Sequence, residues 1–334
     1  MSSKAVRLNS VSLRRLRREL LAWYDQNRRD LPWRKDSNPY RVWVSEIMLQ
    51  QTRVAAVLEH YQRFMRRFPT VQTLSSARES SVLSVWSGLG YYHRARRMRQ
   101  AAKVIVSERM GEFPRTTEEW RTLPGIGRYT AAAIASIALG AEAAVVDGNV
   151  ERILDRMFGR GEDRERTWLQ AETLLDRKSP GDFNQAMMEL GATLCTPRSP
   201  QCALCPLSKW CQFKGAEKAQ PQPARKRRKL YYALARRNGT VLLARRPTDA
   251  SLMAGMWELP SVPESHRDGN ATVVKLRHSI TDTDYDVLVI AVSPDALRGL
   301  ETEARWFAPK QWERLPLTGL ARKVFRKLAD ESGE

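Results

Sequence analysis

Hydrophobic positions in the first two thirds of the chain recur at the spacing of an α-helix. One such segment follows Ser12, which we take as its N-cap, and a longer one follows Pro39 and continues to about residue 68. Pro and Gly residues divide the following stretch into shorter helices, the last three of which are predicted at residues 150–158, 164–175 and 181–194. Residues 12–212 are therefore predicted to be almost entirely helical.

The pattern changes after residue 214. Residues 215–229 lack apolar periodicity and are rich in Pro, Gln and charged residues, which is typical of a linker. We interpret its basic run, ARKRRK, as solvated; a localisation signal and a phosphate contact are the alternatives. Beyond the linker the positions alternate with the period of a strand. Strands are predicted at residues 231–234, 241–243, 272–276 and 286–292, and a closing helix at residues 320–328.

These patterns predict a mainly α domain over residues 1–214 and a small α+β domain over residues 230–334. The most apolar segment, residues 130–146, is interrupted by Gly140 and Glu142, so we expect a core helix and no membrane span. The N-terminus has no apolar run that could serve secretion, so we expect a cytoplasmic protein. A net charge of +19 indicates a polyanionic partner, most commonly nucleic acid, although ribosome-associated and membrane-surface proteins are basic as well.

All four cysteines lie in one short stretch, Cys195-x6-Cys202-x2-Cys205-x5-Cys211. In a reducing compartment such a group indicates a metal or metal–sulfur centre rather than disulfides. Four thiolates suit a tetrahedral zinc ion or a [4Fe–4S] cluster. Structural zinc sites favour two short Cys-x2-Cys pairs. Because only one pair is short here, the spacing favours the larger cluster.

The segment LPGIGRYTA, residues 123–131, lies between two predicted helices. Gly125 and Gly127 permit a tight turn and a close approach of the backbone to a ligand. The helix that follows presents unpaired N–H groups, which bind a phosphate without selecting a base sequence. We interpret the segment as a phosphate-binding hairpin; an ordinary turn between helices is the alternative.

Two carboxyl groups stand in contrasting surroundings. Glu46 lies in the nearly apolar segment VWVSEIML, where desolvation favours a protonated acid. Asp147 precedes a predicted helix, where N–H groups and the helix dipole favour an ionised carboxylate. An acid and an ionised carboxylate form the pair that cleaves a glycosidic bond. From the residues alone two other interpretations stay open, with Asp147 as a simple N-cap and Glu46 on a solvated helix edge.

Together these segments resemble one family, the MutY adenine DNA glycosylases, which belong to the helix-hairpin-helix, iron–sulfur DNA glycosylases. The resemblance extends from about residue 13 to residue 328. It is carried by SEIMLQQT (45–52), LPGIGRYTA (123–131), VDGNV (146–150) and the cysteine loop (195–211). It implies a helix-hairpin-helix glycosylase fold with a [4Fe–4S] cluster, held by Cys195, Cys202, Cys205 and Cys211.

The resemblance also implies roles for individual residues. Glu46 is the acid that protonates the adenine ring and Asp147 stabilises the oxocarbenium-like sugar, while Asn149 and Tyr129 assist them. Gln51 corresponds to a residue that is wedged into the duplex. Positions that line the adenine pocket or contact the strands are Arg29, Trp33, Leu89, Tyr91 and Glu189. Bifunctional relatives carry a lysine in place of Tyr129. Because a phenol cannot form a Schiff base, we expect no efficient strand cleavage.

The second domain resembles the Nudix-like C-terminal domain of the same family, through LLARRP (242–247), LMAGMWELP (252–260) and LPLTGLARKVF (315–325). No Arg-Glu-x-x-Glu-Glu run is present, so we expect this domain to recognise rather than to hydrolyse. The resemblance implies that it reads 8-oxoguanine opposite the adenine. The recognition hairpin of the family usually reads Phe-Ser-His. Its counterpart here has His278, Ser279 and Thr281 as expected contacts, followed by Asp282, whose charge is expected to weaken DNA binding.

The sequence therefore predicts a monofunctional adenine DNA glycosylase. It is expected to act as a monomer on double-stranded DNA that contains A:8-oxoguanine or A:G mispairs, at the nucleoid if the source is bacterial. The first alternative is an endonuclease III-type pyrimidine glycosylase, which Tyr129 and the long second domain disfavour. The second is a non-catalytic iron–sulfur sensor that binds DNA, which has no need of the pair formed by Glu46 and Asp147.

Overall fold

The computed structural model describes residues 9–160, 163–213, 215, 225–280, 282–299, 303–312 and 314–332. The chain divides into two compact units, of which the first comprises Met1–Ser75 and Gln100–Gln220 and the second Ser76–Arg99 and Pro221–Glu334. The first unit is helical and the second combines helices with two β-sheets, which confirms the predicted fold class. The division differs from the expected domain boundary, because residues 76–99 pack with the C-terminal half.

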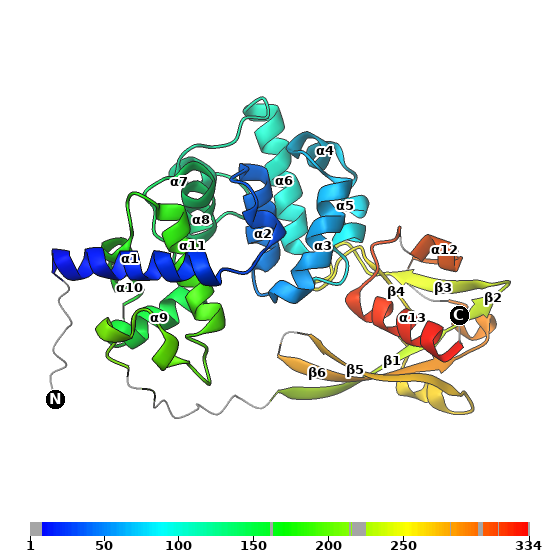
Figure 1. The fold of residues 1–334 in the computed structure, drawn as a ribbon. Coiled ribbons are helices and arrows are strands. Elements are labelled where there is room, and N and C mark those ends of the chain that lie inside the picture. Colours follow the sequence, from blue (N-terminus) through cyan, green and yellow to red (C-terminus); the bar gives the residue numbers. More distant parts are fainter. Residues whose placement is uncertain are drawn as a thin grey trace. The chain divides into compact units, whose positions relative to one another are not determined.

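Helices build the first unit (Figure 1). They are α1 (Ser10–Asn27), η1 (Pro32–Arg34), α2 (Pro39–Leu49), α3 (Val54–Arg67), α7 (Thr117–Arg121), α8 (Arg128–Leu139), α9 (Gly148–Phe158), α10 (Arg164–Leu174), α11 (Pro180–Thr193), η2 (Cys202–Leu204) and η3 (Ser208–Trp210). Two more helices have residues in both units, α4 (Val71–Ser76) and α6 (His93–Glu108). The last three predicted helices are confirmed as α9, α10 and α11, with each end within two residues of its predicted position.

Two details of the helical prediction are wrong. Helix α1 begins at Ser10, and its N-cap is Asn9 rather than Ser12. The Asn9 side chain accepts a hydrogen bond from the backbone amide of Ser12. The long segment predicted after Pro39 forms two helices, α2 and α3. The chain turns between them at Gln51, whose φ of 56° lies in the left-handed region and cannot continue an α-helix.

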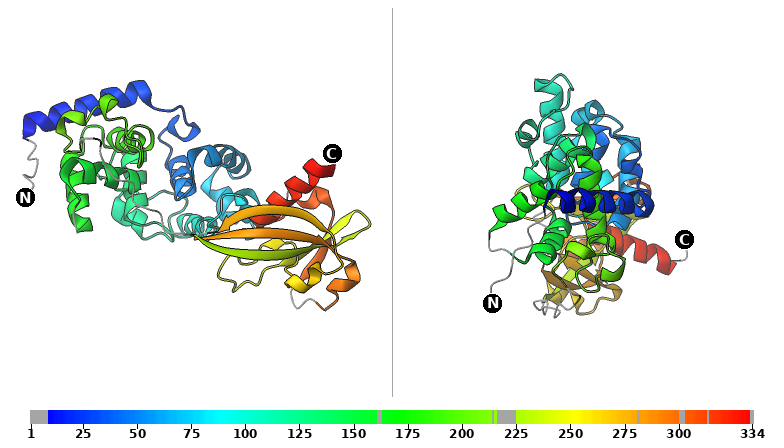
Figure 2. Two further views of the ribbon diagram at one scale, coloured as in Figure 1. Left: turned by 90° about the horizontal axis from the view of Figure 1, so that it is seen from below. Right: turned by 60° about the vertical axis from the view of Figure 1, so that its left-hand side comes forward.

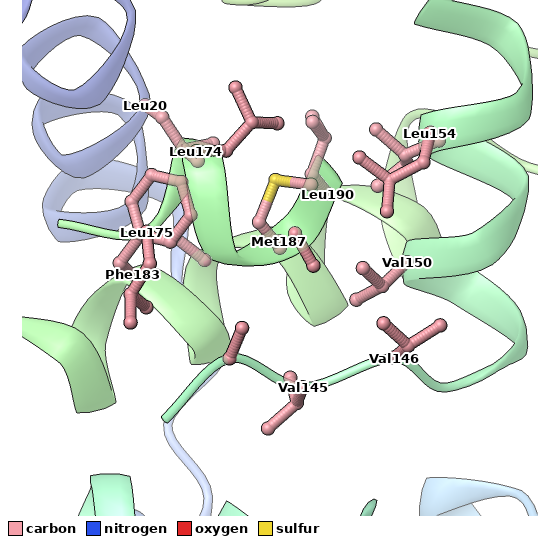
Figure 3. Close-up of a cluster of buried hydrophobic side chains, with 14 of the residues drawn as sticks. Leu20, Val145, Val146, Val150, Leu154, Leu174, Leu175, Phe183, Met187 and Leu190 are labelled. Atoms are coloured by element: carbon pink, nitrogen blue, oxygen red, sulfur yellow. The ribbon is translucent and has the colours of Figure 1, made fainter. Parts of the chain in front are cut away.

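One apolar core cluster of the first unit is formed by α1, α8, α9, α10 and α11 together with residues 144–146 (Figure 3). Figure 3 shows Val145 and Val146 leading from this core to the start of α9. Helix α11 approaches its neighbours most closely at two glycines. A Cβ on Gly191 would lie 2.6 Å from the Cβ of Asn149, and one on Gly181 would lie 2.7 Å from a carbonyl oxygen of α8. This packing fixes the position of the N-terminus of α9.

The C-terminal part of the second unit contains two sheets (Figure 2). In the first, β1 (Lys226–Leu234) pairs in parallel with β6 (Thr283–Ala291), which pairs in antiparallel with β5 (Thr272–Ile280). In the second, β3 (Thr240–Arg245) pairs in antiparallel with β2 (Arg236–Arg237), β4 (Trp257–Glu258) and β7 (Ala304–Phe307). Strand β1 begins at Lys226, so the last residues of the expected linker belong to a sheet.

The helices of the second unit are α5 (Glu79–Trp86), η4 (Glu264–Arg267), η5 (Pro294–Leu297), α12 (Pro309–Trp312) and α13 (Gly319–Ser332). Helix α13 packs Leu320, Val324 and Phe325 into an apolar core with side chains of β1, β3, β5 and β6. Within the described ranges, none of the helices combines the length and the apolar character that crossing a membrane requires.

Candidate active site

Glu46 lies on the buried part of α2. The helix is capped by Asn38, whose side chain accepts hydrogen bonds from the amides of Tyr40 and Arg41 at 3.0 and 3.2 Å. Residues on both sides of Glu46 are buried, and Glu46 itself is only 6% exposed. This burial raises the pKa of the Glu46 carboxyl to about 7. The carboxyl is therefore enclosed rather than placed on a solvated edge.

A second helix brings a phenol to this carboxyl. The hydroxyl of Tyr129, in the first turn of α8, donates a hydrogen bond to Oε2 of Glu46 at 2.8 Å. Burial is the largest influence on the pKa of Glu46, while this hydrogen bond lowers it, the charge of Asp147 raises it and Arg34 lowers it. Asp147 belongs to the same unit as Glu46 and acts on it electrostatically. Near pH 7 the Glu46 carboxyl is therefore partly protonated.

Asp147 is the N-cap of α9. Its Oδ1 accepts hydrogen bonds from the backbone amides of Asn149 and Val150 at 2.9 and 2.8 Å, and its Oδ2 accepts one from Nδ2 of Asn149 at 2.9 Å. Three N–H donors thus surround a group that can only accept when ionised. The capping interpretation and the functional one are compatible, because the same carboxylate caps α9 and acts electrostatically on Glu46.

The Asn149 side chain is held from its other end. Arg152, one turn along α9, donates to Oδ1 of Asn149 at 2.8 Å, to the carbonyl of Gly191 at 2.8 Å and to the carbonyl of Cys195 at 2.9 Å. With its oxygen bound by Arg152, the amide of Asn149 must present its nitrogen to Asp147. A continuous set of hydrogen bonds therefore runs from Asp147 to the first residue of the cysteine loop.

Arg29 and Glu189 contact each other directly. The Glu189 side chain is fully buried. Its Oε1 and Oε2 accept hydrogen bonds from Nε and Nη2 of Arg29 at 2.6 and 2.9 Å. Its Oε2 also accepts one from Nη2 of Arg34 at 2.8 Å. Burial acts to raise the pKa of Glu189, but the hydrogen bonds from the two arginines outweigh it and lower that pKa. Trp33, between the arginines in sequence, is also buried and packs edge-on against Tyr61.

The segment 123–131 forms a hairpin between α7 and α8. Gly125 adopts a φ of 82°, which only glycine adopts without strain, and Gly127 is the N-cap of α8. Among the residues that the structure describes, no side chain caps α8, and a Cβ placed on Gly127 would meet no atom within 4 Å. The first amides of α8 therefore have space in front of them for an anion. Gln51, in the turn between α2 and α3, is exposed.

The four cysteines are half-buried around η2 and η3. The pKa of the Cys205 thiol is raised to about 11, mainly by burial; the other three cysteines also raise it, and a backbone hydrogen bond from Leu207 lowers it. Arg156 donates to Sγ of Cys195 at 3.2 Å, an interaction that suits a thiolate bound to iron. Within the described ranges, no three His, Cys, Asp or Glu side chains are placed to hold a single metal ion.

The remaining predicted residues belong to the second unit. Leu89 is buried and Tyr91 is 42% exposed, both in the turn after α5. His278 and Ser279 lie at the end of β5, where Ser279 donates to Asp284 at 2.7 Å, and burial lowers the pKa of His278. Thr281 lies outside the described residues.

The charge at the tip of this hairpin has a nearby partner. Asp282 lies 3.4 Å from Nζ of Lys226, and Arg225 donates to the neighbouring Asp284 at 2.7 Å. These cations come from the basic run ARKRRK, which was interpreted as a solvated part of the linker. They reduce the repulsion that the Asp282 carboxylate alone would exert on a phosphate.

Arg34 and Arg152 were missed by the sequence reasoning. Arg152 follows Asn149 by three residues on one helix, a spacing that places two side chains on the same face and could have identified it. Arg34 reaches Glu189 from a position 155 residues earlier in the chain. No periodic pattern connects residues so far apart, and this contact appears only in the folded structure.

Known proteins share these features. Residues 44–177 match the HhH-GPD superfamily of base excision DNA repair proteins, and residues 195–211 match the iron–sulfur binding domain of endonuclease III. The second match covers all four cysteines and confirms the iron–sulfur cofactor. Among solved structures, the chain is similar to a thermostable thymine-DNA glycosylase, with a TM-score of 0.57. The two sequences are 30% identical, and the match covers 60% of this chain and 95% of the other chain. A non-covalent endonuclease III–DNA complex, at 24% identity and a TM-score of 0.54, shares the fold.

Curated relatives cover more of the chain. It is 36% identical to the adenine DNA glycosylase of Mus musculus over 94% of this chain and 78% of the relative. The adenine DNA glycosylase of Rattus norvegicus is 40% identical, and the match covers 78% of this chain and 64% of the relative. That of Homo sapiens is 50% identical, and the match covers 59% of this chain and 39% of the relative. The chain thus spans less than two thirds of the rat and human relatives. The predicted resemblance is confirmed, and the chain belongs to the adenine DNA glycosylase family.

Proposed function

We propose that this protein is a monofunctional adenine DNA glycosylase that removes adenine mispaired with 8-oxoguanine or guanine. Its relatives carry the name adenine DNA glycosylase, and the superfamily that it matches consists of base excision DNA repair proteins. The observation that supports the catalytic assignment most is the buried Glu46 carboxyl, whose pKa of about 7 leaves a proton available near neutral pH. Asp147 supplies the second carboxylate that cleavage of a glycosidic bond requires.

The first step is proton transfer to the base. Glu46 gives its proton to a ring nitrogen of the adenine that has been extruded from the duplex. The bond between C1′ of the sugar and N9 of adenine then breaks, and its electron pair stays with the base, which leaves as a neutral purine. The hydrogen bond from Tyr129 orients the carboxyl and stabilises the carboxylate that forms.

The second step is hydrolysis of the sugar cation. As the base leaves, positive charge develops on the sugar, and the Asp147 carboxylate stabilises it electrostatically. Two backbone amides and Asn149 fix the position of that carboxylate before the reaction begins. Water adds its oxygen to C1′ and loses a proton, which balances the proton that Glu46 gave up. The product is an abasic site.

Strand cleavage has no place in this mechanism. A bifunctional glycosylase attacks the sugar with an amine, and the side chain at the hairpin position next to Glu46 is the phenol of Tyr129, which forms no Schiff base. The abasic product therefore keeps an intact backbone until alkali or another enzyme breaks it.

Binding to DNA involves both units. The amides at the start of α8 would hold a phosphate, and the net charge of +19 supports binding without base specificity. When bound by Cys195, Cys202, Cys205 and Cys211, the [4Fe–4S] cluster would cross-link the loop and fix its shape. The hairpin with His278, Ser279 and Thr281 would read the base opposite adenine, and a monomer provides all of these elements. The predicted location at the nucleoid of a bacterium is part of the same proposal.

The test compares Glu46→Gln with wild type and with Glu59→Gln, which changes an exposed glutamate on α3. Each protein is incubated with duplexes that carry adenine opposite 8-oxoguanine, guanine, thymine or cytosine, and breaks are scored with and without alkali. Wild type and Glu59→Gln should give alkali-dependent breaks in the first two duplexes only. Glu46→Gln should lower the rate at least about a thousandfold and still bind the mispairs. Normal turnover by Glu46→Gln would refute the assigned acid.

A further inference from the structure

The turn between α5 and α6, residues 87–92, has an unusual backbone. Gly88, Gly90 and Tyr91 have φ values of 107°, 72° and 47°. The left-handed region is unfavourable for a residue with a Cβ, so the surroundings must hold Tyr91 in this conformation. The turn carries Leu89 and Tyr91, the residues of the second unit expected to contact the DNA around the adenine.

One side of the turn is held by its own neighbours. The indole of Trp86 donates to the carbonyl of Gly90 at 3.1 Å, and the buried guanidinium of Arg94 donates to the same carbonyl at 3.3 Å and to that of Leu89 at 3.5 Å. Arg94 also lies over the ring of Tyr91, 5.3 Å from its centre. These contacts fix the end of the turn that leads into α6.

The other side is held by the C-terminal segment of the chain. The hydroxyl of Ser87, only 2% exposed, donates to the carbonyl of Leu317 and accepts a hydrogen bond from Nε of Arg322 in the first turns of α13. Nη2 of the same guanidinium donates to the carbonyl of Ser84 at 3.3 Å and to that of Leu315 at 3.5 Å. Arg322 thereby binds the C-terminal end of α5, at a carbonyl that also accepts a hydrogen bond from the backbone amide of Ser87.

The residue after Arg322 contacts the recognition strand. Nζ of Lys323 donates to the carbonyl of Arg277 on β5 at 2.6 Å, and its charge contributes to lowering the pKa of the adjacent His278. Two successive residues of α13 therefore bind two different elements. Lys323 binds the strand that ends in the recognition hairpin, and Arg322 binds the turn that carries Leu89 and Tyr91, all within the second unit.

We propose that Arg322 is a positioning residue that couples the recognition hairpin to the turn at residues 87–92. A base bound by the hairpin changes or stabilises the position of β5, and Lys323 passes that change to α13. Arg322 then passes it to the turn at residues 87–92. The turn in response holds Tyr91 in the conformation that contacts the base stack of the DNA. Arg322 itself touches neither the adenine nor the reacting atoms. This inference rests on the proposed function, because it assigns Arg322 to the recognition of a partner base by an adenine glycosylase.

The test uses Arg322→Ala, with Arg322→Lys as the conservative variant and Arg326→Ala as the control on an exposed position of the same helix. Single-turnover release of adenine is measured on two duplexes. One has adenine opposite 8-oxoguanine, and the other has adenine opposite a tetrahydrofuran abasic-site analogue, which offers the hairpin no base. Thermal unfolding and the visible absorbance of the cluster are recorded for each protein.

Arg322→Ala should slow release opposite 8-oxoguanine at least about tenfold while release opposite the abasic analogue stays within about twofold of wild type. Arg322→Lys should restore part of the difference, because an ammonium group can still donate to Ser87. Arg326→Ala should match wild type on both duplexes.

An equal loss on both duplexes, or no loss opposite 8-oxoguanine, would overturn the coupling role. If Arg322→Ala does not fold, Ser87→Ala removes the same bond from its other end and must give the same difference between duplexes. If wild type releases adenine from neither duplex, it is the proposed function that fails.

Discussion

The pKa of about 7 at Glu46 is a balance of opposing influences. Burial raises it, the hydroxyl of Tyr129 lowers it, the charge of Asp147 raises it and Arg34 lowers it. Because the folded-state pKa lies above the ordinary glutamate value of 4.5, the folded protein binds more protons than the unfolded chain between these pH values. Raising the pH through this window therefore lowers the free energy of unfolding, by about 3 kcal/mol. The protein gives up this stability to keep an acid available.

Tyr129→Phe tests one of these influences separately. The variant removes the hydrogen bond that lowers the pKa of Glu46, so that pKa rises and the acid stays protonated to a higher pH. We expect the alkaline fall in the single-turnover rate to move up by about one pH unit. Tyr231→Phe, which removes a hydroxyl bonded to Glu264 in the other unit, should leave the profile unchanged. A profile that moved to lower pH in Tyr129→Phe would contradict the account.

Some of the site could be predicted residue by residue. Three features are local, and each is visible in a short stretch of sequence. They are the Glu46 carboxyl within an apolar run, the position of Asp147 before a helix and the spacing of the cysteines. The pairing of Glu189 with Arg29 is not local, because the partners are 160 residues apart. Sequence reasoning assigned both to the pocket or the strand contacts and did not anticipate that they bind each other.

At the scale of elements, the close contact of α9 with α11 positions Asn149 and, through it, the Asp147 carboxylate that we propose acts on the sugar. Asn149 lies in the first turn of α9, where its side chain meets both Asp147 and Arg152. Gly191 on α11 lies directly against the backbone and Cβ of Asn149. Any side chain at this glycine must push α9 away, and Asn149 with it.

Gly191→Ala adds a Cβ that would lie 2.6 Å from the Cβ and 3.1 Å from the Cα and carbonyl oxygen of Asn149. We expect the free energy of unfolding to fall by about 1–3 kcal/mol, as is usual for overpacking. Single-turnover adenine release should fall at least about tenfold below the melting range, because Asn149 no longer fixes Asp147. Ala192→Ser, an exposed neighbour on α11, serves as the control for both measurements. Wild-type stability and rate in Gly191→Ala would show that the contact is unimportant.

Element boundaries could be predicted where local signals agree. The ends of the last three helices of the first unit lie within two residues of their predicted positions, and α9 is followed directly by Gly159. The break between α2 and α3 was missed because it depends on the backbone conformation of Gln51, a residue type that gives no signal for a left-handed φ. Strand β1 was predicted to start late, because its first residues are basic and exposed and only pairing with β6 makes them a strand.

At the scale of the whole molecule, the division into units could not be predicted from composition. Residues 76–99 continue the helical pattern of the first half, yet they pack with the C-terminal half through contacts such as that of Arg96 with the carbonyl of Ala254. Such contacts join residues more than 150 positions apart, beyond the range of any periodic pattern. As a result, the turn with Leu89 and Tyr91 shares a unit with the hairpin that we propose reads the base opposite adenine.

The central claim is that Glu46 acts as a neutral acid. The most direct measurement is the single-turnover rate of adenine release by the wild-type protein between pH 5 and 9, on a duplex with adenine opposite 8-oxoguanine. Since only the protonated carboxyl can act, the rate should bend near pH 7 and then fall about tenfold per pH unit. A rate that stays constant or rises between pH 7 and 9 would contradict the claim.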